Sequence, residues 1–193
     1  SLVGSEMCIR DRREGVAGSV TFINLEGTRP ILIEIQALVD KSMLPNPKRL
    51  TVGTDAQRLT MLLAILHRHV TLSTYDQDVF LNAVGGIKIN ETASDLAVLI
   101  AIVSSMTNQA VSSKTAIFGE VGLGGEIRPV SRGQERIKEA SKLGFKRIIV
   151  PLKNKASDIP DVEIIGVDNL RDAVKVVFGS NRVKNDEQIY PDE

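Results

Sequence analysis

The chain has 193 residues, 42% of them hydrophobic and 25% charged, and its 24 basic residues balance its 24 acidic ones. This length is enough for one large domain with a buried core. No apolar run approaches the roughly 20 residues that span a bilayer, and no signal peptide opens the chain, so we expect a cytoplasmic protein without a membrane partner. The single cysteine, Cys8, excludes an internal disulfide and a metal site built from this chain's cysteines.

The first residues differ in character from the rest of the chain. The stretch SLVGSEMCIRDR, residues 1–12, has neither helical nor strand periodicity and resembles a translated sequencing adapter. The last residues, 180–193, are polar and are predicted to be a disordered tail. We therefore predict a non-native segment over 1–12, one domain over 13–179 and a tail over 180–193.

The first half of the domain contains strands followed by two helices. Two β-rich runs, residues 18–27 and 29–40, are joined by a tight turn. The run TDAQRLTMLLAILHRHV is typical of an amphipathic helix capped by Thr54 or Asp55, with both histidines on its surface. In the run ETASDLAVLIAIVSSM, Thr92 and Asp95 have the spacing of a helix start. This second helix is apolar on nearly all sides, so we expect it to be the buried central helix.

The second half begins with a hairpin signal, in which TAIFGEVGL and EIRPV flank two adjacent glycines. A helix from Arg132 to Leu143 follows, where Ser131 and Gln134 match a capping box. Two further strands lead to a last helix capped by Asp168. This order predicts a compact α/β domain with a mixed β-sheet and packed helices. Neither GxGxxG nor GxxxxGK[ST] occurs, so we expect no nucleotide site in the chain.

Two long motifs carry a family resemblance: GGIKINETASDLAVLIAIVSS and GEVGLGGEIRPVSRGQERIKEASKLGFKRIIVP. Together with EGVAGSVTFINLEGTRPILIEIQALV and QRLTMLLAILHRH, they make the chain similar to the C-terminal Lon-protease-like domain of the RadA (Sms) family of bacterial recombinational repair proteins. The similarity extends from about Glu14 to Gly179. It implies a Lon-protease-like domain with a ribosomal-protein-like α/β fold.

The resemblance also implies a longer parent protein. Such a parent would carry an N-terminal four-cysteine zinc finger and a RecA-like ATPase, so that zinc and ATP with Mg would be cofactors of that part and none would bind to this segment. Members of the family resemble hexameric, ATP-driven branch-migration helicases. The implied partners are other copies in a homo-hexameric ring, single-stranded or branched DNA, and the RecA recombinase.

Lon-type proteases use a serine nucleophile and a lysine base, and the resemblance places Ala93 and Gln134 at those two positions. Neither side chain can perform the step, so we predict no catalytic residue and no metal ligand here. Ser94 and Lys138 are the remaining pair, but Ser94 is rotated by about 100° from Ala93, and Lys138 lies about 6 Å beyond Gln134 along the helix. A residual Ser–Lys peptidase therefore stays an unfavoured alternative.

Positive charge is concentrated between Lys114 and Lys155, where ten basic and four acidic residues give a net charge of +6. Contact with DNA phosphates is one interpretation of this run, and an ordinary solvated helix face is the other. The candidates for DNA contact are Arg58, Arg68, Arg128, Arg132, Arg136 and Lys138. A scaffold that assembles a ring without touching DNA is a further alternative.

Overall fold

The computed structural model describes residues 15–180. The predicted non-native segment, residues 1–12, and nearly all of the predicted tail, residues 180–193, lie outside the described part of the chain. The helices of the described part include none that is long and apolar enough to cross a membrane.

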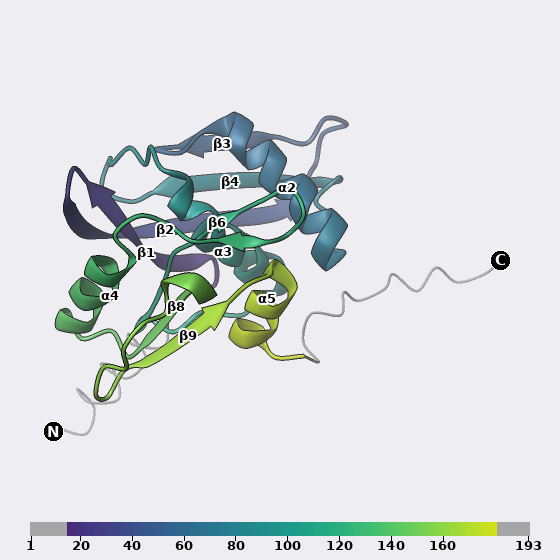
Figure 1. Cartoon of the computed structure of the whole chain (residues 1–193). Coiled ribbons are helices and arrows are strands. Elements are labelled where there is room, and N and C mark those ends of the chain that lie inside the picture. The colour runs from purple at the N-terminus through teal and green to yellow at the C-terminus, as the bar shows by residue number, and fades with distance from the viewer. Residues whose placement is uncertain (1–14, 181–193) are drawn as a thin grey trace, which may run out of the picture.

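A seven-stranded mixed sheet forms the centre of the domain, in the order β3-β4-β2-β1-β5-β8-β9 (Figure 1). Its strands are β1 (Ser19–Glu26), β2 (Arg29–Lys41), β3 (Arg49–Val52), β4 (Gln77–Ala83), β5 (Thr115–Ile117), β8 (Arg147–Pro151) and β9 (Glu163–Val167). Strand β2 is antiparallel to both β1 and β4, whereas the remaining neighbours pair in parallel. The prediction of a compact α/β domain with a mixed sheet is thereby confirmed.

A second, two-stranded sheet pairs β6 (Glu120–Val121) with β7 (Ile127–Arg128). The two strands are joined through the adjacent glycines that predicted a hairpin, and Gly125 adopts a positive φ of 77° that few other residues tolerate. This small hairpin connects the central strand β5 to the helix that carries the candidate dyad position Gln134.

Within residues 15–180, four α-helices pack around the central sheet: α2 (Ala56–Val70), α3 (Asp95–Thr107), α4 (Gly133–Lys142) and α5 (Leu170–Phe178). In the same part of the chain, the 3₁₀ turn η1 (Thr92–Ser94) precedes α3, and the 3₁₀ turn η2 (Leu152–Asn154) follows β8. Helix α3 packs on β1 and β2 and contacts α2 and α5, whereas α4 contacts β1, β2 and β8.

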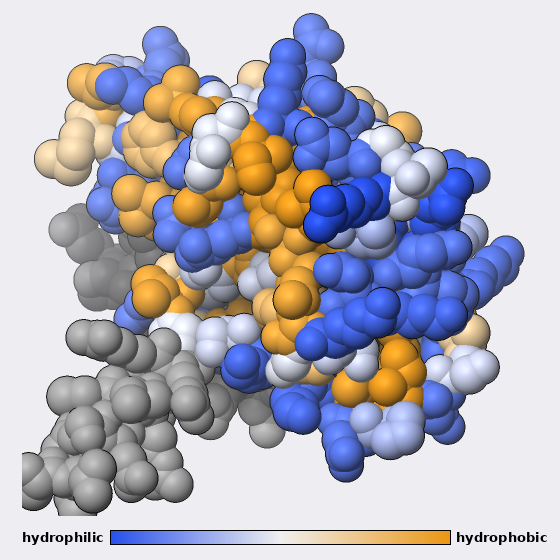
Figure 2. Space-filling model, turned by 90° about the vertical axis from the view of Figure 1, so that its left-hand side faces the viewer, coloured by the Kyte–Doolittle hydropathy of each residue, from blue (hydrophilic) through white to orange (hydrophobic). Residues whose placement is uncertain are grey.

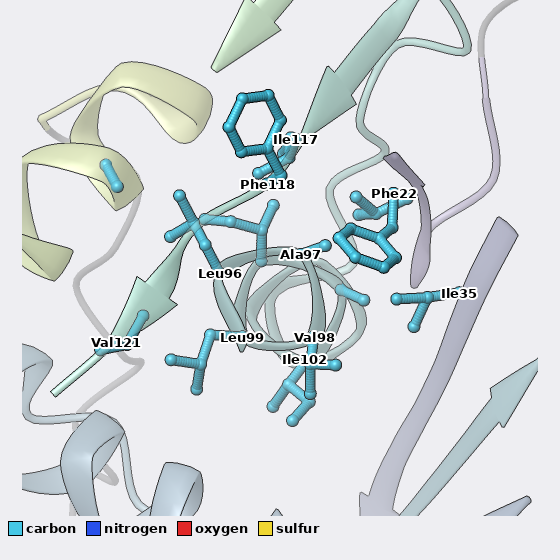
Figure 3. Packing of buried hydrophobic residues seen from close by; sticks show 14 of the residues in the cluster. Phe22, Ile35, Leu96, Ala97, Val98, Leu99, Ile102, Ile117, Phe118 and Val121 are labelled. Atoms are coloured by element: carbon cyan, nitrogen blue, oxygen red, sulfur yellow. The ribbon is translucent and has the colours of Figure 1, made fainter. Parts of the chain in front are cut away.

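Helix α3 forms the centre of the core, as its apolar sequence predicts. Every residue from Asp95 to Ser104 is buried. Figure 3 shows the helix end-on, with Phe22 and Ile35 on one side, Phe118 above it and Val121 on the opposite side. Burying each large aliphatic side chain contributes about 1.5–3 kcal/mol, so the position of this helix is strongly determined by packing.

The helix starts agree only partly with their sequence signals. Asp55 caps α2 as expected, since its Oδ1 accepts a hydrogen bond from the Arg58 amide at 3.0 Å. The prediction that Asp168 caps α5 is wrong, because Asn169 accepts from the Asp172 amide instead. Thr92 does not cap α3, which has no side-chain cap. Short polar residues at neighbouring positions compete for a cap, and backbone geometry decides between them.

Candidate functional site

The first candidate position, Ala93, lies in η1 and is 3% exposed. Its carbonyl accepts a hydrogen bond from the Gly119 amide at 2.8 Å, and the Leu96 amide donates to the Gly119 carbonyl at 3.0 Å. These two bonds join the start of α3 to the segment between β5 and β6. The position is rigidly held, but a methyl group there supplies no nucleophile.

The neighbouring hydroxyl, that of Ser94, is engaged in a local hydrogen bond. Its Oγ donates to the Glu91 carbonyl at 3.0 Å, and the residue is buried. Lys138 is exposed on α4. A serine nucleophile needs a base close enough to take its hydroxyl proton. The Ser94 hydroxyl instead donates its proton to the Glu91 carbonyl, which is not such a base.

The second candidate position, Gln134, is exposed in the first turn of α4. The predicted capping box is wrong: Arg132 occupies the cap position, with no side-chain cap, and Gln134 Nε2 donates to the Asn154 carbonyl at 2.8 Å. The Asn154 side chain in turn accepts from the Val130 amide at 2.8 Å and donates to the Val130 carbonyl at 3.0 Å. These bonds hold η2 against the start of α4.

Arg136, a predicted DNA contact, is fully buried, and the prediction is wrong for this residue. Its guanidinium binds both carboxylate oxygens of Glu91, at 2.5 and 2.8 Å, and donates to the Ile23 and Ser131 carbonyls. It also lies 5.8 Å from the centre of the Phe118 ring. The signal was present in the sequence, because position 136 shares the buried stripe of α4 with Gly133, Ile137 and Ala140.

Arg58, another predicted DNA contact, is also committed to an internal ion pair. It binds the carboxylate of Asp95, which is 1% exposed, through Nε at 3.0 Å and through a second nitrogen. The Val121 amide donates to the same carboxylate at 3.0 Å. Burial raises the pKa of Asp95, and the hydrogen bonds from Arg58 and Val121 oppose that rise. The hydrogen bond to Asp95 raises the pKa of Arg58.

A cavity of about 380 Å³ lies beside this pair, between α2 and the start of α3. Its polar lining includes Thr54, Arg58, Lys88, Glu91, Ser94 and Asp95. Three of these side chains are already in ion pairs: Arg58 and Asp95 with each other, and Glu91 with Arg136. No group of three or more His, Cys, Asp or Glu residues within residues 15–180 is arranged to hold a metal ion.

Exposed cations gather instead around the start of α4. Arg128, Arg132 and Lys138 are exposed, as predicted for surface contacts. Because the bonds of Asn154 hold η2 against α4, the adjoining exposed residues Lys153 and Lys155 lie next to the segment that carries Arg132. We call Arg128, Arg132, Lys138, Lys153 and Lys155 the α4 basic surface.

None of these five cations forms an ion pair with another described residue. Glu135 and Glu139 lie on the same helix and reduce the local charge without pairing. Lys153 and Lys155 belong to the basic run between Lys114 and Lys155 but are not among the predicted DNA contacts, because only the hydrogen bonds of Asn154 show that they lie beside Arg132.

The remaining candidate, Arg68, is exposed in the last turn of α2. The neighbouring His69 shares a hydrogen bond of 2.8 Å between its Nε2 and the Leu123 carbonyl, so this helix end lies by the β6–β7 hairpin. Arg68 thus belongs to a different element from the α4 basic surface.

Comparison with known proteins gives a first similarity over about half of the chain. Residues 61–154 match the family described as subunit ChlI of Mg-chelatase. This stretch contains the buried helix α3, the β6–β7 hairpin and α4, and so both candidate dyad positions. This part of the α/β domain is therefore similar to the ChlI subunit.

More of the chain matches individual bacterial proteins. It is 55% identical to the DNA repair protein RadA of Pseudomonas aeruginosa over 86% of its length, and 54% identical to that of Escherichia coli over 84%. The protein of the same name from Bacillus subtilis is 43% identical over 91%. The chain spans 36–39% of the length of these three relatives. The chain is therefore similar to one segment of these DNA repair proteins.

Proposed function

We propose that the chain is a non-proteolytic domain of a RadA-type, ATP-dependent branch-migration helicase in recombinational DNA repair, where it contacts DNA and helps to assemble a hexameric ring. The observation that carries this proposal is the α4 basic surface, five exposed cations without ion-pair partners among the described residues. Unpaired cations of this kind attract phosphates without regard to base sequence. Any ligand with many phosphates could bind such a surface. The similarity to proteins named for DNA repair supports DNA as that ligand.

The proposed contact is electrostatic. Arg128 precedes α4 on β7, and Arg132 stands at the helix start. Lys153 lies in the η2 turn beside it, and Lys155 directly follows that turn. A phosphate backbone that crosses this end of α4 would meet cations from two segments. In a ring each contact is repeated in every subunit, so individually weak contacts can add to a strong interaction.

The absence of proteolysis in this proposal follows from the two dyad positions. Ala93 and Gln134 cannot act as nucleophile and base. The hydrogen bond of Ser94 to the Glu91 carbonyl also argues against that hydroxyl as a substitute. ATP hydrolysis with Mg, and a zinc finger, would then belong to the rest of the parent protein, along with contacts to RecA.

The test is DNA binding by the chain and by an Arg128→Ala, Arg132→Ala, Lys153→Ala variant, measured by fluorescence anisotropy with single-stranded and forked DNA over a salt series. We expect weaker binding, and a salt dependence whose log–log slope is smaller by roughly 0.7–0.9 for each phosphate that the variant no longer neutralises. An equally charged control replaces the exposed cations Arg29, Lys41 and Lys175 with alanine. An equal weakening in both triple variants, or none in the first, would remove the α4 basic surface as the site.

The same preparation tests the absence of peptidase activity. We expect no cleavage of casein or of fluorogenic peptides. Cleavage that disappears in Ser94→Ala would instead establish a residual peptidase that uses Ser94.

A further inference from the structure

Exposed hydrophobic side chains accompany the cations of the α4 basic surface. Figure 2 shows the side of the domain where the β1–β2 hairpin and α4 lie, with a band of hydrophobic side chains bordered by hydrophilic ones. Leu152, which precedes Lys153 in η2, is 51% exposed, and Leu143 at the end of α4 is 56% exposed. A surface that combines unpaired cations with exposed leucines fits a ligand that is both acidic and hydrophobic.

The sequence of this chain contains a segment with that chemistry beyond the described residues. Residues 186–193, DEQIYPDE, carry four acidic side chains and no basic one, and we call them the acidic segment. The acidic residues stand on both sides of Ile189 and Tyr190, which supply the hydrophobic part. The acidic segment and the α4 basic surface are therefore complementary both in charge and in hydrophobic content.

The fold brings the end of α5 within reach of η2. Arg147, the first residue of β8, donates to the Val176 carbonyl in the last turn of α5 at 3.1 Å. The turn η2 directly follows β8, and a strand of five residues spans about 16 Å. Asp186 is seven residues beyond Gly179, a length of chain that extends up to about 25 Å. The acidic segment is therefore long enough to meet the cations at η2.

We propose that the α4 basic surface binds the acidic segment of the same chain. In this contact the carboxylates of the segment face Arg132, Lys153 and Lys155, and its two hydrophobic residues cover Leu152. A short tether holds two partners at an effective concentration of the order of 1 mM, so individually weak ion pairs are sufficient. The acidic segment thereby competes with any other polyanion for these cations.

The cations nearer to the end of α5 fit the acidic segment less well. Arg171 already donates to the His69 carbonyl, which leaves Lys175 as the other cation of this helix. The α4 basic surface instead combines cations from two adjoining segments with an exposed leucine. The contact itself does not require DNA, whereas its effect on DNA binding rests on the proposed function.

The first test detects the contact without DNA, by comparing backbone amide signals in NMR spectra of the full chain and of a neutralised variant. The neutralised variant carries three substitutions in the acidic segment: Asp186→Asn, Glu187→Gln and Asp192→Asn. We expect shift differences at Leu152, Lys153 and Lys155 that persist on tenfold dilution, because both partners belong to one chain. Differences confined to α2 and α5, differences that vanish on dilution, or none within residues 15–180 would each overturn the proposal.

The second test measures competition with single-stranded DNA by fluorescence anisotropy at low salt. If the acidic segment occupies the surface for about 70–90% of the time, the neutralised variant should bind DNA about 3- to 10-fold more tightly than the unchanged chain. An equally charged control replaces exposed acids elsewhere: Glu26→Gln, Asp40→Asn and Asp161→Asn.

The control should change the DNA affinity by less than about twofold, because exposed charges distant from the surface are screened by salt. An equal gain in both variants contradicts the competition, as does a gain that survives the addition of Arg132→Ala and Lys153→Ala. A chain that binds no DNA in any form would overturn the proposed function, while the NMR comparison would still decide whether the contact exists.

Discussion

Two ion pairs flank Ala93 and differ in what surrounds them. Before Ala93, Glu91 binds Arg136 of α4, a guanidinium that is fully buried and also contacts two backbone carbonyls. After it, Asp95 binds Arg58 of α2, and here the carboxylate is buried while the guanidinium is 27% exposed beside a cavity. In the first pair the cation is in the core, and in the second the anion is.

The difference shows how the start of α3 is held from both sides. The two acidic residues are four apart in the sequence, and η1 and α3 contain no lysine or arginine that could pair with them locally. Each reaches a different helix, so η1 lies between α4 and α2. The start of α3 is thereby held on both sides of Ala93, the candidate nucleophile position.

The largest effect is expected for Arg136→Ala. The substitution leaves Glu91 without its cation, removes the hydrogen bonds to the Ile23 and Ser131 carbonyls, and opens a cavity in the core. We expect a loss of about 3–5 kcal/mol in the free energy of unfolding. Urea denaturation followed by circular dichroism measures it, and Arg132→Ala on the exposed side of the same helix start is the control. Equal stability of both variants would contradict the buried pair.

Arg58→Ala should have a smaller effect that depends on pH. Burial already raises the pKa of Asp95, and removing Arg58 removes an interaction that opposes this rise. An acid whose folded-state pKa is raised stabilises the fold at low pH, and this contribution is lost as pH rises through the folded-state pKa. We therefore expect a loss of about 2–3 kcal/mol at neutral pH and a smaller one in mild acid. Urea denaturation at both pH values checks this, and a loss independent of pH would contradict it.

Asn154→Ala tests the link between η2 and α4. The variant loses both side-chain hydrogen bonds to Val130. We expect a destabilisation of about 1–2 kcal/mol, together with weaker DNA binding because Lys153 and Lys155 are no longer held beside Arg132. Lys153→Ala is the informative comparison: it should weaken DNA binding while the free energy of unfolding changes by less than about 0.5 kcal/mol.

The smallest effect is expected for Lys138→Ala, which removes an exposed cation without an ion-pair partner in the described part of the chain. The free energy of unfolding should change by less than about 0.5 kcal/mol. A larger change, in thermal or urea denaturation, would mean that Lys138 has a structural partner and would weaken its assignment to the α4 basic surface.

Several features could be predicted from the sequence because they depend on local pattern. Helix α3 is apolar on all sides, and such a helix is stable only when it is surrounded by other elements. The adjacent glycines predict the β6–β7 hairpin, and Asp55 predicts the start of α2. Both predictions succeed because turn and cap geometry involve only a few neighbouring residues. The residue types at the two candidate dyad positions, Ala93 and Gln134, are likewise read directly from the sequence.

The roles of the charged residues were decided by the tertiary structure. Arg128, Arg132 and Arg136 are alike in sequence, but only Arg136 meets a carboxylate, because β1, η1 and α4 converge on it from distant parts of the chain. Gln134 contacts the Asn154 carbonyl instead of closing a capping box, for the same reason. Local pattern determines which elements form, whereas the partner of a long polar side chain depends on which elements are packed beside it.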